Sequence, residues 1–140
     1  MPQVTVNYLA VLAVGVEAMV IGMLWYGPLF GKTWLKLIGA NPNDHKEMAK
    51  MKKESGPAMA SSIVGSLLTG YVLSHVVDYA GSKTLTDGLL AGFWMWLGFV
   101  TPVVASGVLY GRKPFKLFYV DSGYYLAHLL VAGVIVTLWV

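Results

Sequence analysis

The sequence contains no cysteine, and charged residues make up only 12% of its 140 residues. Without cysteine the chain forms no disulfide, thiolate metal site or cysteine nucleophile, and the redox state of its compartment is left open. Soluble domains carry about 25% charged residues, so this chain has too few to cover a water-facing surface. Apolar residues reach 56%. The composition therefore indicates a protein whose surface faces lipid.

Four long apolar runs divide the chain. They cover about 8–30, 58–80, 88–110 and 115–139, and a membrane-spanning helix needs about 20 such residues. Each run is far longer than a barrel strand of about 10 residues. Backbone groups in lipid must be satisfied within the segment, which favours helices. We predict an all-α four-transmembrane-helix bundle, forming a single integral membrane domain over residues 1–140.

Local signals predict how the helices end, bend and pack. Asn7 is a cap for the first helix, and Thr86 or Asp87 for the third. Pro102 lacks an N–H and should kink the third helix, with the hydroxyl of Thr101 or Ser106 compensating. Small residues recur every four positions on the second helix and recur on the third, which favours close helix packing over a pore lining. These residues are Ala58, Ser62, Ser66, Gly70 and Ser74, then Gly88 and Gly92.

The basic residues gather in two of the connections. The connection 31–57 holds six lysines, and the short turn region 111–116 holds Arg112, Lys113 and Lys116. Beyond the spans, the opposite side holds only Lys83. The positive-inside rule then places loops 31–57 and 111–116 in the cytoplasm and both termini outside it. This topology accounts for the basic pI, so we predict the lipid bilayer as a partner and no nucleic acid.

Two stretches of the chain resemble two others. "YVLSHVV" (71–77) matches "YYLAHLL" (124–130), and "WYGPLFGK" (25–32) matches "LYGRKPFK" (109–116). Both helix hairpins run in the same direction, so a duplication would give two related αα hairpins in a parallel repeat. Chance similarity between apolar helices is the alternative, and the sequence alone leaves both open.

Several ionisable residues fall inside the apolar runs, where a charge costs about 2.5–3.5 kcal/mol at the bilayer centre. A helical rise of about 1.5 Å per residue places Glu17 and His128 at similar depth near the midplane, with His75 nearer the outer face. Helical spacing puts Asp121 on the stripe of His128 and Tyr71 on the stripe of His75. We predict an intramembrane polar cluster, made of Glu17, Tyr71, His75, Asp121, Tyr124, Tyr125 and His128.

Such a cluster can relay protons or hold a cation, or its hydrogen bonds can simply fix the packing of the helices. The ligand-type residues lie on three helices without HxxE or HxxxH spacing, so metal binding stays undetermined. No nucleotide-binding loop, nucleophile elbow or zinc-protease motif is present. We therefore predict no cofactor and name no catalytic residue.

Two longer stretches carry a family resemblance: "VIGMLWYGPLFGKTWLKLIG" (20–39) and "LYGRKPFKLFYVDSGYYLAHLLVAG" (109–133). Over nearly its whole length the chain resembles the DUF1761 family of small multi-pass membrane proteins. The most specific parts are Trp25 to Pro28 with the following Phe30 to Lys32 and Trp34, and the stretch 116–125. The resemblance implies a four-helix membrane protein. It implies no chemistry, because the function of that family is unknown.

Three hypotheses for function follow. The leading one is proton-linked transport or permeation of a small solute or ion by a homo-oligomer or a larger membrane complex. The first alternative is an accessory or structural subunit of such a complex. The second is a membrane-embedded enzyme that acts on a lipophilic substrate, for which no residue pattern argues.

Overall fold

The computed structural model describes residues 3–140, and within that range all regular structure is helical, with no strand. Four helical stretches are long and apolar enough to cross a membrane: Tyr8–Leu29, Gly56–Tyr79, Leu85–Tyr110 and Lys116–Leu138. The predicted all-α class with four membrane-spanning helices is therefore confirmed. The elements are α1 (Tyr8–Leu24), η1 (Trp25–Leu29), α2 (Gly31–Leu37), α3 (His45–Glu54), α4 (Gly56–Tyr79), α5 (Leu85–Met95), η2 (Trp96–Val100), α6 (Thr101–Tyr110) and α7 (Lys116–Leu138).

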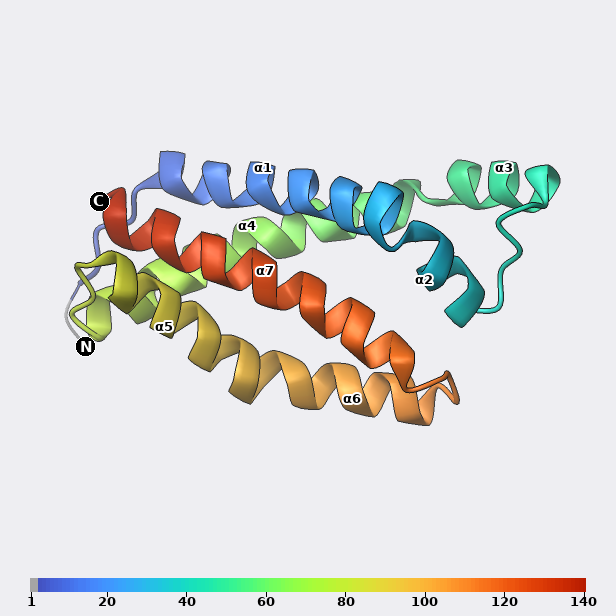
Figure 1. Ribbon diagram of the computed structural model, residues 1–140. Coiled ribbons are helices and arrows are strands. Elements are labelled where there is room, and N and C mark those ends of the chain that lie inside the picture. The colour runs from blue at the N-terminus through green and yellow to red at the C-terminus, as the bar shows by residue number, and fades with distance from the viewer. Residues whose placement is uncertain (1–2) are drawn as a thin grey trace.

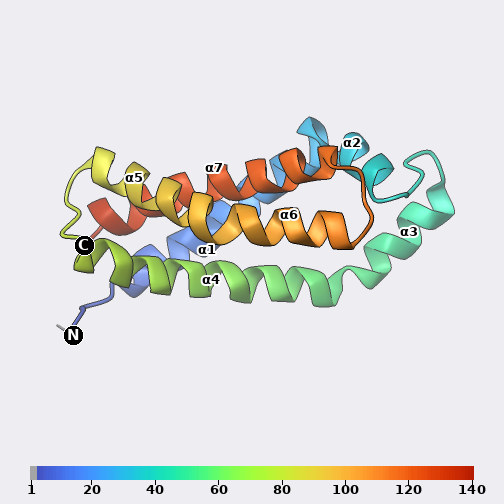
Figure 2. The ribbon, with the colours of Figure 1, turned by 90° about the horizontal axis from the view of Figure 1, so that it is seen from below.

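Helix α7 lies at the centre of the bundle and packs against α1, α4, α5 and α6. Both ends of the described chain lie at one end of the bundle, together with the turn between α4 and α5 (Figures 1 and 2). We call this the terminal end. Helices α2 and α3 and the turn between α6 and α7 lie at the other end, which we call the loop end.

The caps of the first and third spans show where the sequence signals succeed and fail. The Asn7 side chain accepts hydrogen bonds from the backbone N–H groups of Leu9 (3.0 Å) and Ala10 (3.3 Å), so the predicted cap is confirmed. The third span begins earlier than predicted, because Thr84 is its cap. Asp87 instead completes a capping box, in which its carboxylate accepts from the backbone N–H of Thr84.

The third span changes its winding just before Pro102. Residues Trp96–Val100 form a π-helix, η2, between α5 and α6. The Thr101 hydroxyl donates to the carbonyl of Leu97 at 2.7 Å, which is the compensation that the sequence predicted. A wider π-type turn next to a proline lets the chain remain helical although an N–H is missing.

Two tryptophans fasten the π-helices to α7. Trp25 begins η1 and donates its indole N–H to the Val120 carbonyl at 2.9 Å. Trp96 begins η2 and donates to the Ser122 carbonyl at 2.8 Å. The points at which the first and third spans depart from α-helix are therefore both hydrogen-bonded to the same short stretch of α7.

The terminal-end half of the bundle contains the packed core. Its buried apolar side chains are Val14, Leu73, Val77, Leu129, Ala132 and Val136. Helices α5 and α7 meet there almost backbone to backbone: a Cβ atom placed on Gly92 would lie 2.2 Å from the Leu129 carbonyl oxygen. One placed on Gly133 would lie 2.2 Å from the carbonyl oxygen of Gly88. The predicted packing role of Gly88 and Gly92 is confirmed.

The loop-end half is open, because α4 departs from the other helices. Residues 56–65 of α4 are exposed, whereas Ser66, Gly70 and Ser74 are buried. Gly70 packs tightly on Val14 of α1. Within the chain, the predicted packing strip on the second helix is therefore buried only over its terminal-end half, whereas Ala58 and Ser62 are exposed beside a groove.

Candidate functional site

Glu17 and His128 form an ion-pair contact inside the bundle. The Glu17 Oε1 atom lies 2.5 Å from His128 Nδ1, and the two side chains are 11% and 5% exposed. Glu17 stands on α1 between the buried residues Val14 and Ala18. The two groups lie at the same level along the bundle, as the count of helical residues predicted. A proton shared between them can reside on the carboxylate or on the imidazole.

Tyr124 links this pair to the groove. Its ring lies nearly parallel to the His128 ring, with centroids 6.1 Å apart. Its hydroxyl donates to the carbonyl of Ala18 at 3.0 Å, next to Glu17 in the chain. Since Tyr124 and Ala18 also line the groove, the Glu17–His128 pair lies directly behind the groove wall.

Asp121 lies one helical turn from Tyr124, toward the loop end. Its carboxylate accepts a hydrogen bond of 2.7 Å from the hydroxyl of Tyr26. The ring centroids of Tyr26 and Tyr124 are 5.5 Å apart, and those of Tyr124 and Tyr125 are 5.1 Å apart. The structure thus joins five of the predicted cluster residues in one region: Glu17, Asp121, Tyr124, Tyr125 and His128.

Tyr71 and His75 lie elsewhere. The His75 Nδ1 atom is 2.9 Å from the Tyr71 carbonyl oxygen, within α4, and its ring packs between those of Tyr71 and Tyr79. Tyr71 is exposed. Within residues 3–140, no hydrogen bond or ring contact joins either residue to Glu17 or His128. The two histidines that the internal repeat aligns therefore have different surroundings, and the repeat itself stays a prediction.

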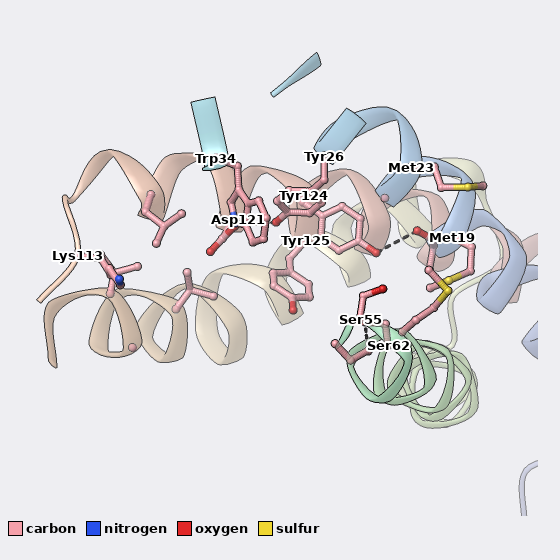
Figure 3. Close-up of a pocket in the computed structure, with 18 residues that line it drawn as sticks. Met19, Met23, Tyr26, Trp34, Ser55, Ser62, Lys113, Asp121, Tyr124 and Tyr125 are labelled. Atoms are coloured by element: carbon pink, nitrogen blue, oxygen red, sulfur yellow. Dashed lines mark hydrogen bonds between the residues drawn. The ribbon is translucent and has the colours of Figure 1, made fainter. Parts of the chain in front are cut away.

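An open-sided groove of about 740 Å³ lies in the loop-end half of the bundle (Figure 3). Its size is within the ordinary range of ligand pockets. Helices α1, α4, α6 and α7 supply most of its wall. The lining residues that bear on function are Met19, Met23, Tyr26, Trp34, Lys113, Asp121, Tyr124 and Tyr125.

The terminal side of the pair is closed by apolar packing. The core residues Val14, Leu73 and Ala132 fill the bundle there. A second, smaller cavity of about 50 Å³ lies at the terminal end, near Asp78 and Thr137. The Glu17–His128 pair therefore lies between the groove in the loop-end half and the apolar core in the terminal-end half.

Tyr26 and Trp34 belong to the site although the sequence prediction did not include them. Both lie close to the point where the first span leaves regular helix geometry, around Gly27 (φ −109°, ψ −105°). This turn directs Tyr26 toward Asp121 and brings α2 against α7. The "WYGP" stretch is visible in the sequence, but tyrosine and tryptophan are also common where a span meets the lipid interface, so their presence alone does not indicate a site.

Within residues 3–140, no group of three or more His, Asp or Glu side chains could hold a metal ion. In that range no Lys or Arg side chain lies within 4 Å of the Asp121 carboxylate. Its partner is the Tyr26 hydroxyl. The site thus consists of one buried acid–imidazole pair and one carboxylate among aromatic rings.

Comparison with known proteins gives one match. The model of the family described as "Protein of unknown function (DUF1761)" matches residues 9–137. No curated protein and no solved structure matches the chain. The match covers all four candidate membrane spans almost completely.

Proposed function

Because the chain belongs to the DUF1761 family, whose function is unknown, no relative supplies an activity, and we propose one from the geometry. We propose that the protein moves a small solute or ion across the membrane in a proton-linked manner. The four candidate spans make it a multi-pass membrane protein. The proposal concerns what the polar groups between those spans do.

The observation that carries the proposal is the Glu17–His128 pair behind the wall of the groove. A carboxylate and an imidazole in hydrogen-bond contact can exchange a proton. An ionisable pair within a span is costly and marks a solute or proton pathway by default. A pair that only oriented helices would need no groove beside it.

The difference between the two sides of the pair also supports transport. The groove lies in the loop-end half of the bundle, and the apolar core fills the terminal-end half. A transporter needs a site that is reached from one side at a time. In the proposed cycle, this conformation is the one in which the pair is approached from the loop-end half of the bundle.

The test is proton flux in liposomes. The purified protein is reconstituted around a trapped pH-sensitive dye, and gradients of alkali cations, chloride, organic ammonium ions or carboxylates are imposed. We expect at least one solute gradient to drive proton movement in the wild type. We expect Glu17→Gln to reduce that movement to the rate of protein-free liposomes, because an amide cannot accept and release the proton.

The matched control is Glu54→Gln. Glu54 is an exposed acid at the end of α3, outside the groove, so its loss should leave flux unchanged. Folded wild-type protein that moves no protons with any of these solutes would contradict the proposal. Equal flux in the wild type and Glu17→Gln would contradict the role of the pair.

We also propose that the loop end faces the cytoplasm, since nine of the ten basic residues fall at the connections 31–57 and 111–116. The cysteine-free chain makes a clean labelling test. In intact cells, a membrane-impermeant maleimide should label Lys83→Cys and not Lys46→Cys, both of which change exposed residues. The reverse labelling would contradict the orientation.

For assembly, we propose a homo-oligomer or a larger membrane complex. The exposed stretch 56–65 of α4 is rich in small residues, which let another helix approach closely. Native mass measurement in nanodiscs should give a mass above that of one chain. A single chain that retains proton-linked flux would contradict this part of the proposal.

A further inference from the structure

The groove has an uneven distribution of charge. Among its lining residues in the described chain, Asp121 is the only carboxylate and Lys113 the only ammonium group. The Lys113 Nζ atom donates to the Ile38 carbonyl at 3.2 Å, toward the loop end. Figure 3 labels both side chains at the groove, and no salt bridge joins them. Lys113 therefore makes no direct ion pair with Asp121.

Aromatic rings surround Asp121 on the groove side. Tyr26 contacts Trp34 and Tyr124 with ring centroids 5.5 Å apart in each case. Tyr125 extends this wall beyond Tyr124, at 5.1 Å. Figure 3 shows these rings grouped near the carboxylate. The faces of tyrosine and tryptophan rings attract cations, most strongly where water is scarce.

The remainder of the lining is mainly apolar and adaptable. It includes Met19, Met23, Met59, Val104 and Leu117. Methionine side chains are flexible and polarizable, and they adjust to ligands of different shape. An apolar substituent of a bound molecule would lie against this part of the wall.

We propose that the groove binds an organic ammonium ion that carries an apolar substituent. Asp121 is its counter-ion, the rings of Tyr26, Trp34, Tyr124 and Tyr125 surround the cationic group, and the methionines contact the substituent. A bare metal ion fits less well, because hard cations take about six oxygen ligands and the groove offers one carboxylate. As the solute of a transporter, this ligand class rests on the proposed function. Binding itself does not depend on it.

The experiment measures binding of benzyltrimethylammonium to the purified full-length protein in uncharged maltoside detergent, by isothermal titration calorimetry. We expect saturable binding, and none of benzenesulfonate, which has a similar ring and the opposite charge. Asp121→Asn should weaken binding about tenfold or more, because the counter-ion of a desolvated cation is lost. Glu54→Gln should bind as the wild type does. Equal binding of cation and sulfonate, or unchanged binding in Asp121→Asn, overturns the proposal.

A second pair of variants covers the case in which Asp121→Asn fails to fold. Tyr125 is 40% exposed and contacts the cluster through its ring. Tyr125→Phe should retain binding, and Tyr125→Leu should weaken it about threefold or more, since a cation–π contact contributes about 0.5–2 kcal/mol. Equal binding by these two variants overturns the aromatic part of the site.

A lipid headgroup is another source of an ammonium group. Repeating the titration with phosphatidylethanolamine added separates the two sources: unchanged affinity supports a free organic ammonium ion, and competition overturns that assignment. No gradient is present in this experiment. Binding without flux in liposomes would therefore support this inference and contradict the transport proposal. Flux of inorganic ions without binding would support the transport proposal and contradict this inference.

Discussion

Replacing Gly92 with alanine is expected to lower the free energy of unfolding by about 3 kcal/mol, at the upper end of what overpacking costs. The new Cβ atom would lie 2.2 Å from the Leu129 carbonyl oxygen and 2.7 Å from its carbonyl carbon. These are backbone atoms of α7, so no side-chain rotation relieves the overlap. Helices α5 and α7 must move apart, and the contacts along their whole interface weaken. Unfolding by sodium dodecyl sulfate in mixed micelles, followed by circular dichroism, measures the change.

Gly107→Ala is the matched control. Gly107 is exposed on α6, and a Cβ atom there would meet nothing within 4 Å. Because alanine is the better helix former, this change should be neutral or stabilising by up to about 1 kcal/mol. Similar stability of the Gly92→Ala and Gly107→Ala variants would show that α5 and α7 do not meet backbone to backbone.

His128→Leu should destabilise the protein by about 3–5 kcal/mol, the usual cost of leaving one member of a buried ion pair without its partner. The double variant Glu17→Leu with His128→Leu should recover most of that loss, since an apolar pair of similar volume is often neutral or stabilising. The surroundings permit this, because Val14 and Ala18 beside Glu17 are buried and apolar. Both variants should lose proton-linked flux.

This double-mutant cycle separates structure from function. A pair that only fixes packing predicts that flux returns when stability returns. A pair that carries the proton predicts a stable double variant without flux. Additive destabilisation by the two single changes would contradict the contact itself, and full flux in the double variant would contradict the proposed mechanism.

The fold could be predicted because its main determinants lie along the chain. Apolar length places the four spans, and the Asn7 side chain and Pro102 mark features that depend only on near neighbours. The exact start of the third span was harder to predict. Thr84, Thr86 and Asp87 could each cap it, and the reciprocal hydrogen bonds of Thr84 and Asp87 decide between them.

The depth of the site residues along their helices could be predicted from the sequence, but the rotation of each helix about its axis could not. Counting residues placed Glu17 and His128 at one level, and the structure joins them. The same count placed His75 nearby, but depth does not say which side of a helix faces the bundle. On α4 the close contact of Gly70 with Val14 fixes the rotation, and it leaves His75 beside Tyr71 and Tyr79.

The groove could not have been predicted, because it results from long-range departures from a regular bundle. One is the non-helical backbone of Gly27, which directs Tyr26 toward Asp121. Another is the separation of the first part of α4 from its neighbours. Neither leaves a periodic signal in the residues concerned. Both depend on how helices far apart in sequence pack against one another.

The two ends of α4 also differ mechanically. Near Gly70 the helix packs tightly against α1. Its first part, the stretch 56–65, is exposed and has few packing contacts to hold it in place. By contrast, turning α7 about its axis would break the two indole hydrogen bonds at Val120 and Ser122. Movement of the first part of α4 toward α6 is therefore the least costly way to narrow the groove. A crosslink between α4 and α6 would hold the groove closed.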